Sequence, residues 1–295
     1  MGGNMVQRLL QDDHDVVVFD MQEDAVRSAE QKGAAGARSV KEFVDKLEQR
    51  RVVWIMVPAG EAVDKTIEEV QPHLERNDII VDGGNSKYKD TLRRNEQLKD
   101  AEIIYVDAGM SGGVWGLQEG YSMMIGGPDE AIDYLTPIFK TLAPGPDRGW
   151  SHVGRTGAGH FVKMVHNGIE YGMMEAYAEG FAVLKNKEEF ELDLHQVAET
   201  WRYGSVIRSW LLDLTSRALE DDQDLQELAP YVEDSGEGRW TAIDAIDMDI
   251  PTPIITLALI ERLRSRVTDS YTDKLLAAMR NQFGGHAVKK EKAAV

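Results

Sequence analysis

A single helix with a polar stripe is predicted by the stretch Gly157-Ala-Gly-His-Phe-Val-Lys-Met-Val-His-Asn-Gly-Ile-Glu-Tyr171. Side chains at positions i, i+3, i+4, i+7 and i+8 share one face of a helix. Here those positions hold Lys163, His166, Asn167, Glu170 and Tyr171. The other positions are mostly apolar or small, and burying polar groups among them is costly unless they are paired or meet a ligand. The pattern therefore favours the floor of an active site over a solvent-facing stripe.

The composition limits the class of protein. A chain of 295 residues suits two domains, and the absence of cysteine excludes disulfides and thiolate metal sites. The formal net charge of −18 argues against nucleic acid or an anionic membrane as a partner. The sequence has neither a run of about eighteen apolar residues nor a signal peptide, so we expect a soluble cytoplasmic protein. It also lacks a convincing cluster of metal ligands.

Residues 1–153 alternate strand patterns with helix patterns. Near-continuous apolar runs occur at residues 16–20, 51–57, 78–82 and 102–107. Such runs fit strands that are buried on both faces, and amphipathic stretches of crossover length separate them. We predict an α/β domain with a Rossmann-type, doubly wound parallel sheet that binds NAD, with the ligands at the carboxyl ends of its strands.

Residues 154–295 read as helices almost throughout, after a short extended segment at 150–154. The first helix spans about 157–187, which is long for a globular protein. Shorter helices are predicted at 193–203, 206–219, 239–248, 252–267 and 270–282. We predict an all-helical domain that binds the substrate and forms the interface between subunits.

Residues near the start of the chain match the second half of a dinucleotide-binding fingerprint. Gly2 and Gly3 open a helix pattern, and Asp20 ends the strand pattern that follows. An acidic residue in this place accepts hydrogen bonds from the adenosine ribose and repels a 2′-phosphate. The first strand and the first two glycines of the usual motif are not in this sequence. We therefore expect the natural protein to carry about ten more residues before Met1.

Polar turns that contain glycine follow the next strand patterns. The first of them holds Val57, Pro58 and Ala59, which we predict to contact the cofactor. The next two hold Asn85, Ser111, Gly112 and Gly113. These residues can offer neutral side chains and close backbone N–H groups to a carboxylate or a ribose. Each turn alone also fits an ordinary tight turn, but both would face one cleft.

Two potential cations, Arg280 and His286, end the last helix pattern beside a pair of glycines. On this pattern alone, ordinary capping of a helix C-terminus by Arg and Gly is the favoured interpretation. Arg262 and Arg266 lie four positions apart on one helical face and also fit a surface pair.

Four of these motifs together resemble the decarboxylating 6-phosphogluconate dehydrogenases. They are Lys163–Tyr171, Asp82–Ser86, Ser111–Gly113 and Arg280–His286. The resemblance spans essentially the whole chain and is closest to the short form of the family. The spacing Gly159-x-x-x-Lys163-x-x-x-Asn167 alone indicates only the broader β-hydroxyacid dehydrogenases, and the continuation through Tyr171 narrows the match.

The resemblance implies a role for each matching residue. Lys163 matches the catalytic lysine and Glu170 the catalytic acid, and Asn167 belongs to the same catalytic set. The sugar acid would be held by Ser111, Gly112, Gly113, His166 and Asn167, with Asn85 between substrate and nicotinamide. Contacts to the phosphate are implied for Tyr171, Arg262 and, from a neighbouring subunit, Arg280 and His286. The implied reaction converts 6-phosphogluconate and NAD into ribulose 5-phosphate, CO2 and reduced cofactor, in a homodimer or homotetramer.

The sequence departs from the family pattern at two places. Ser235 and Glu237 stand where long-form enzymes carry a lysine and a threonine for the phosphate. Asp20-Met21 replaces the Asn-Arg of NADP-preferring members, which points to NAD. Two alternatives stay open. A non-decarboxylating NAD-dependent β-hydroxyacid dehydrogenase would not need Glu170. A non-catalytic protein that binds no cofactor would fit a chain without the first strand.

Overall fold

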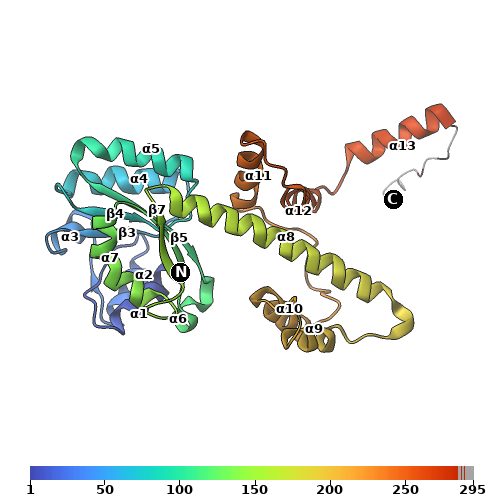
Figure 1. The fold of residues 1–295 in the computed structure, drawn as a ribbon, viewed down its shortest axis with the longest axis horizontal. Helices are drawn as coiled ribbons and strands as arrows, with labels where there is room; N and C mark the ends of the chain where they lie inside the picture. The colour runs from blue at the N-terminus through green and yellow to red at the C-terminus, as the bar shows by residue number, and fades with distance from the viewer. Residues whose placement is uncertain (285–286, 288, 290–295) are drawn as a thin grey trace. The chain divides into compact units, whose positions relative to one another are not determined.

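The computed structural model describes residues 1–284, 287 and 289 (Figure 1). The chain forms two compact units. The first comprises Met1–Ile169 and Trp240–Met248, and the second comprises Glu170–Arg239 and Asp249–Val295. Helix α8 (Ala158–Asn186) belongs to both units. The compact units and the predicted domains, 1–153 and 154–295, are therefore different divisions of the chain, and the predicted boundary stays a prediction.

Five strands form the main sheet of the first unit. In spatial order they are β3 (Val52–Ile55), β4 (Ile79–Asp82), β5 (Ile104–Ser111), β6 (Ser122–Gly126) and β7 (Trp150–Gly154). β3, β4 and β5 pair in parallel, as do β6 and β7, whereas β6 runs antiparallel to β5. β1 (Val17–Val18) and β2 (Ala35–Gly36) form a separate parallel pair. The predicted Rossmann-type fold is confirmed, although the apolar runs predict neither β2 nor the antiparallel β6.

Helices of the first unit pack on both faces of the main sheet (Figure 1). Residues 1–149 contain α1 (Gly2–Leu10), α2 (Glu23–Glu30), α3 (Val40–Asp45), α4 (Glu61–Val70), α5 (Tyr88–Leu98), α6 (Gly116–Glu119) and α7 (Asp129–Leu142), with short 3-10 helices at Gln71–His73, Lys99–Ala101 and Gly113–Trp115. On one face Leu135 of α7 shares a core with Ile79 of β4. On the other face Val63 of α4 shares a core with Ile80. Successive residues of one strand are thus buried in opposite directions, which explains the continuous apolar runs.

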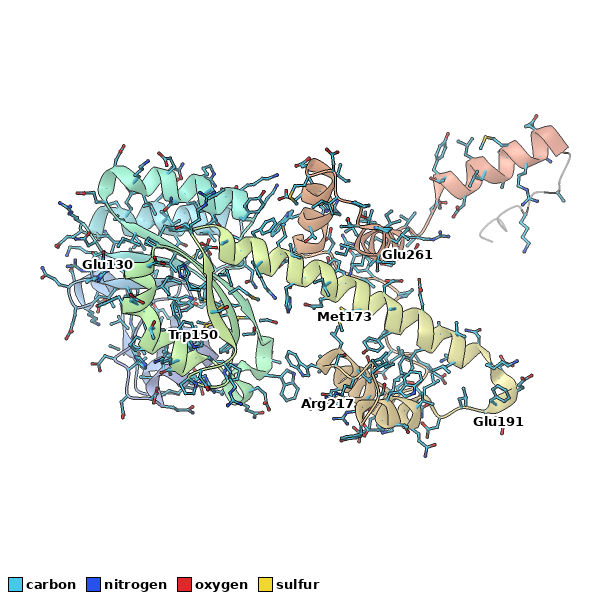
Figure 2. All side chains as sticks on the ribbon, viewed as in Figure 1. Glu130, Trp150, Met173, Glu191, Arg217 and Glu261 are labelled. Atoms are coloured by element: carbon cyan, nitrogen blue, oxygen red, sulfur yellow. The ribbon has the colours of Figure 1, made fainter. Side chains whose placement is uncertain are left out.

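Phe139 of α7 lies between two tryptophans in the first of these cores. Its ring centroid is 6.1 Å from that of Trp54 on β3 and 5.5 Å from that of Trp150 on β7, which is labelled in Figure 2. Aromatic pairs at such distances contribute beyond the area that they bury. The α7 helix therefore contacts both outer strands of the main sheet.

The rest of the chain is helical, as predicted. Its helices are α8, α9 (Leu194–Arg202), α10 (Trp210–Asp221), α11 (Glu237–Asp247), α12 (Pro253–Arg264) and α13 (Tyr271–Gly284), with a 3-10 helix at Glu188–Phe190. In the second unit, Phe181 of α8, Ala198 of α9 and Leu212 of α10 form one apolar core. Each helix pattern of the sequence corresponds to one of these helices.

A buried carboxylate anchors the start of α8 to the sheet. Asp107 of β5 accepts hydrogen bonds from the backbone N–H groups of Gly157 (2.6 Å) and His160 (2.8 Å). A helix leaves such donors without intrahelical partners in its first turn, and negative charge is favoured there. Gly159 lies so close to the sheet that a Cβ would be only 2.4 Å from the carbonyl oxygen of Met124. The start of α8 thus lies directly on β5 and β6.

Gly159→Ala should therefore destabilise the protein by about 1–3 kcal/mol, the usual cost of overpacking a tight contact. Gly180 is a matched control, because it lies on the same helix and a Cβ there would meet no atom within 4 Å. Gly180→Ala should leave the stability unchanged or raise it by up to about 1 kcal/mol, since alanine is the better helix former. Urea denaturation measures both free energies of unfolding. Equal stability of the two variants would contradict the close approach of α8 to the sheet.

Candidate active site

Lys163 lies about one turn beyond this anchor, against β5. It is 4% exposed, and a Cβ on Gly109 would lie 2.4 Å from its own Cβ. A glycine at position 109 therefore leaves the room that the lysine stem needs. The Lys163 Nζ atom lies 3.3 Å from Nδ1 of His166, and that nitrogen lies 2.9 Å from Oδ1 of Asn167. The structure thus brings these three predicted site residues into one chain of polar contacts.

The tautomer of His166 decides which of these two contacts is a hydrogen bond at Nδ1. Nδ1 of the histidine accepts a hydrogen bond from a lysine ammonium only when it carries no proton itself. When Nδ1 carries the proton, it donates to the Asn167 carbonyl. The unprotonated Nδ1 can accept from the Lys163 amine in either charge state, since a neutral amine also carries N–H groups. Such an arrangement suits a lysine that accepts and returns a proton.

Asn85 joins the ends of β4 and β5. It adopts a φ of +53° in the turn after β4, a left-handed conformation that asparagine tolerates. Its Nδ2 donates to the carbonyl oxygen of Met110 (3.1 Å), and its Oδ1 accepts from the Met110 N–H (2.8 Å). Ser111 follows Met110 directly, and Gly112 and Gly113 turn the chain with φ of +139° and +52°. The structure therefore brings the two predicted substrate turns together and already uses part of the Asn85 amide to do so.

Some of the predicted cofactor residues lie at the same end of the main sheet as these two turns. Gly2 is the first residue of α1, and a Cβ on it would lie 3.3 Å from the Cβ of Met56. Val57, Pro58 and Ala59 follow Met56 directly, so α1 begins beside this turn. Asp20 follows β1 in the separate strand pair, is exposed, and accepts a hydrogen bond from the Gln22 N–H (2.8 Å).

The predicted phosphate residues of the second unit meet around Tyr171. The guanidinium carbon of Arg262 lies 3.6 Å from the centroid of the Tyr171 ring. The Tyr171 hydroxyl lies 3.1 Å from Oγ of Ser235, which donates to the carboxylate of Glu237. Arg266 instead donates to the carbonyl oxygen of Val232 (3.0 Å). The structure therefore brings Arg262, rather than Arg266, onto Tyr171.

Two further predicted residues lie on helices, and a third cannot be placed. Glu170 lies on α8, two turns after Lys163, and Arg280 lies on α13. His286 lies outside the described residues. Over the described part of the chain, no group of three or more His, Asp and Glu side chains could hold a metal ion. The same part contains no helix that is long and apolar enough to cross a membrane.

Several buried charged groups near this end of the sheet are not predicted from the sequence. Arg94, Asp107 and His160 are each at most 1% exposed. The signal that could have found Arg94 is its position, since Thr91, Arg94 and Leu98 are the buried residues of α5 and share one helical face. A charged residue on the buried face of a helix is seldom tolerated unless it is paired.

Comparison with known proteins agrees with this arrangement. Residues 1–154 match the model of the NAD binding domain of 6-phosphogluconate dehydrogenase, and residues 159–293 match that of its C-terminal domain. The chain is 44% identical over 291 residues to YqeC of Bacillus subtilis, named a putative 6-phosphogluconate dehydrogenase, and the match covers 99% of this chain and 97% of YqeC. It is also 44% identical over 292 residues to the NAD(+)-dependent, decarboxylating 6-phosphogluconate dehydrogenase of Haloferax volcanii, covering 99% and 96% of the two chains.

Solved structures show the same fold. The 6-phosphogluconate dehydrogenase of Plasmodium falciparum superposes with a TM-score of 0.82 at 28% identity, covering 99% of this chain and 65% of that longer one. A 3-hydroxyisobutyrate dehydrogenase of Mycobacterium tuberculosis shares the fold, with a TM-score of 0.69 at 21% identity and coverage of 88% and 87%. The family models and the near full-length relatives together decide the assignment: this chain belongs to the 6-phosphogluconate dehydrogenase family.

Proposed function

We propose that this protein oxidises and decarboxylates 6-phosphogluconate with NAD, giving ribulose 5-phosphate and CO2. The observation that carries the proposal is the buried Lys163 beside Gly109, in polar contact with His166 and, through it, Asn167. A buried lysine with such partners suits a base that takes a proton from a hydroxyl group. Family membership supports a nicotinamide cofactor, and the relative from Haloferax volcanii is named NAD(+)-dependent and decarboxylating.

The residues of the first unit fit a dinucleotide. The start of α1 presents backbone N–H groups beside the turn after β3, and a helix N-terminus in this place suits a pyrophosphate. The exposed carboxylate of Asp20 can accept hydrogen bonds from a ribose diol. The residues that would hold NAD are therefore Gly2, Asp20, Val57, Pro58 and Ala59, with Asn85 near the nicotinamide. NAD, when bound, accepts the hydride from C3 of the substrate.

Lys163 and Glu170 would supply the proton transfers. Neutral Lys163 accepts the proton of the C3 hydroxyl as C3 is oxidised to a ketone. The resulting ammonium protonates the 3-keto oxygen as the C1 carboxylate leaves as CO2, which stabilises the charge that develops on that oxygen. Protonated Glu170 then gives its proton to C1 of the enediol, in product numbering. Lys163 takes back the hydroxyl proton, so that the ketone of ribulose 5-phosphate forms.

The reaction is tested by assaying cofactor reduction and CO2 release together. Four mixtures combine 6-phosphogluconate or gluconate with NAD or NADP. With 6-phosphogluconate and NAD, we expect the amount of CO2 released to equal the amount of NAD reduced. Cofactor reduction without CO2 would identify a non-decarboxylating dehydrogenase. No reduction in any mixture, with no NAD binding by calorimetry, would identify a protein without a cofactor.

The catalytic roles predict the effects of two substitutions. Lys163→Met should abolish turnover, and Glu170→Gln should lower kcat by a factor of about 10² or more, the usual effect of losing a positioned acid or base. Lys185→Met is a control on the same helix, because Lys185 forms an ion pair with Asp224 at 2.6 Å and is 45% exposed. That variant should keep the wild-type kcat in a steady-state assay. A nearly wild-type rate for Lys163→Met would refute the mechanism.

Asp20 should set the preference for NAD over NADP. Its carboxylate would repel a 2′-phosphate, and Met21, which is 94% exposed, supplies no cation to offset the repulsion. We expect kcat/KM to favour NAD by at least about tenfold, and replacement of Asp20-Met21 by Asn-Arg to narrow or invert the preference. Asp24→Asn, which removes an exposed carboxylate paired with Arg27, should change neither kcat/KM for NAD nor kcat/KM for NADP. Equal efficiency of the wild type with both cofactors would contradict this role.

Exposed apolar side chains of the second unit support a homo-oligomer. Those that are more than a third exposed include Met173 and Met174 of α8, Ile254, Leu257 and Ile260 of α12, and Leu275, Leu276 and Met279 of α13, of which Met173 is labelled in Figure 2. Clusters of exposed apolar side chains of this kind mark interfaces between proteins. We propose a dimer or tetramer in which these helices contact a second copy of the chain.

If Arg280 and His286 of one subunit reach the site of its neighbour, activity requires the oligomer. Removal of residues 280–295 should then raise the KM for 6-phosphogluconate well beyond any change in the KM for NAD. Arg280→Ala should show a smaller effect in the same direction, because it removes one of the two cations. Sedimentation velocity at the assay concentration measures the oligomeric state. A fully active monomer would rule out this arrangement.

A further inference from the structure

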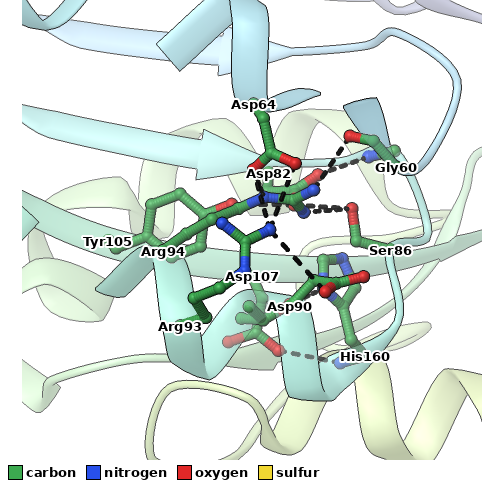
Figure 3. Close-up of polar contacts among 12 residues, drawn as sticks. Gly60, Asp64, Asp82, Ser86, Asp90, Arg93, Arg94, Tyr105, Asp107 and His160 are labelled. Carbon is green, nitrogen blue, oxygen red and sulfur yellow. Dashed lines mark hydrogen bonds and ion pairs between the residues drawn. The ribbon is translucent and has the colours of Figure 1, made fainter. Parts of the chain in front are cut away.

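We propose that Arg94 is a positioning residue that holds the cofactor turn and the substrate turn in a fixed relation. Arg94 lies on α5 and is 1% exposed (Figure 3). The inference rests on the proposed function, because it assumes that the turn after β3 and the turn after β4 hold NAD and substrate. It concerns the geometry of these turns, and the proton transfers do not involve Arg94.

The guanidinium bonds to both turns and to α4. Its Nε donates to Oδ1 of Asp64 on α4 (2.8 Å). Its Nη2 donates to the carbonyl oxygen of Gly60 (2.9 Å), the residue after the predicted cofactor turn 57–59. Its Nη1 donates to Oγ of Ser86 (3.0 Å) and lies 3.3 Å from Oδ2 of Asp82. One rigid planar group therefore spans the ends of β3 and β4, which the flexible single ammonium of a lysine could not do.

Asp82 is fully buried at the end of β4, and its carboxylate is turned into the protein. It accepts hydrogen bonds from the Gly84 N–H (3.0 Å), the Ser86 hydroxyl (2.8 Å) and the Tyr105 hydroxyl (2.8 Å). Burial and the adjacent Asp82 carboxylate raise the pKa of Tyr105, so its hydroxyl stays protonated and donates. Arg94 adds the positive charge that a buried carboxylate requires. Asp82 therefore shapes the turn 83–86 and does not face a ligand.

The same contacts reach the predicted substrate residues. Asn85 lies between Gly84 and Ser86, the two residues that Asp82 holds, and its amide pairs with the backbone of Met110. Hydrogen bonds thus connect Gly60 through Arg94 to Ser86, and the adjacent residue Asn85 continues the connection to the end of β5. Small displacements of positioning groups can lower a rate by about 10²-fold, so a path of this kind bears directly on turnover.

Arg93 provides a matched control. It is the neighbouring residue on α5, and its Nη2 also bonds to both oxygens of Asp64 (2.9 and 3.1 Å). It is 44% exposed, and its polar partners Asp64, Asp90 and Gln97 lie on α4 and α5. Hydrogen bonding to Arg94 is the main reason that the pKa of Asp64 lies below its ordinary value, with a further contribution from Arg93. Arg93→Ala therefore removes a bond to Asp64 and leaves both turns untouched.

The experiment compares amide hydrogen exchange and steady-state kinetics of Arg94→Lys and Arg93→Ala. In Arg94→Lys, exchange should rise by at least about tenfold at 83–84 and at 63–64, where the N–H groups donate to the Gly60 carbonyl, while the main strands keep their protection. For the same variant, kcat should fall at least about tenfold and both KM values should rise. Arg93→Ala should match the wild type in both assays. A purely stabilising role of Arg94 would instead lower kcat in proportion to the folded fraction, with both KM values unchanged, and would overturn the proposal.

Ser86→Ala keeps the proposal testable if Arg94→Lys does not fold. It removes one small hydroxyl that joins Arg94 to the second turn, so exchange should rise at 83–84 but not at 63–64, and kcat should fall. Unchanged exchange and kcat in this variant would overturn the proposal. Hydrogen exchange needs neither substrate nor cofactor. A wild type that fails to oxidise 6-phosphogluconate therefore refutes the proposed function. Hydrogen exchange of the two turns that does not change in the variants refutes the role of Arg94.

Discussion

The hydrogen bonds from the start of α8 to the buried carboxylate of Asp107 fix the position of the predicted catalytic lysine. Burial raises the pKa of Asp107, and the N–H groups of Gly157 and His160 act in the opposite direction. His160 is tied in addition to Thr91 of α5 through Nδ1 (2.7 Å). The first turn of α8 is therefore held from β5 and from α5 at once. Lys163 follows on the same rigid helix, so its stem can lie only against Gly109.

One strand, β5, sets the register of the part of the candidate site that lies in the first unit. Tyr105 donates to Asp82, and Asp107 holds α8 two residues later. Gly109 leaves room for Lys163, and the backbone of Met110 pairs with Asn85. Because alternate residues of a strand point to opposite faces, Tyr105, Asp107 and Gly109 all lie on one side of the sheet. A shift of β5 by one residue would turn these positions to the other side and disconnect the lysine from the turns.

The sequence predicts the features that depend on neighbouring residues, and it does not predict the contacts between residues far apart in the chain. Apolar runs predicted β3, β4 and β5, and the five polar residues of α8 followed from helical spacing alone. The antiparallel β6 was missed because its direction depends on pairing with β5, which no local pattern encodes. The partner of the Asn85 amide was missed for the same reason, since Met110 lies 25 residues away. The partners of Arg94 were missed because Gly60, Asp64 and Ser86 come from outside its helix, which no helical spacing encodes.

The departure from the family pattern at Ser235 and Glu237 has a physical consequence in the second unit. Because Ser235 donates its proton to Glu237, the Tyr171 hydroxyl must donate to Ser235, and both protons are used within the protein.

An anion at this cluster would therefore depend on guanidinium groups. Arg239 already forms an ion pair with Asp234 (2.6 Å). Arg262 donates to neutral acceptors, the carbonyl oxygen of Glu233 (2.9 Å) and the sulfur of Met174 (3.4 Å). Hydrogen bonds to neutral acceptors leave the positive charge of Arg262 in place, whereas the pair with Asp234 largely cancels that of Arg239. The charge that could attract a phosphate here therefore lies on Arg262, held at a fixed place by its stacking on Tyr171.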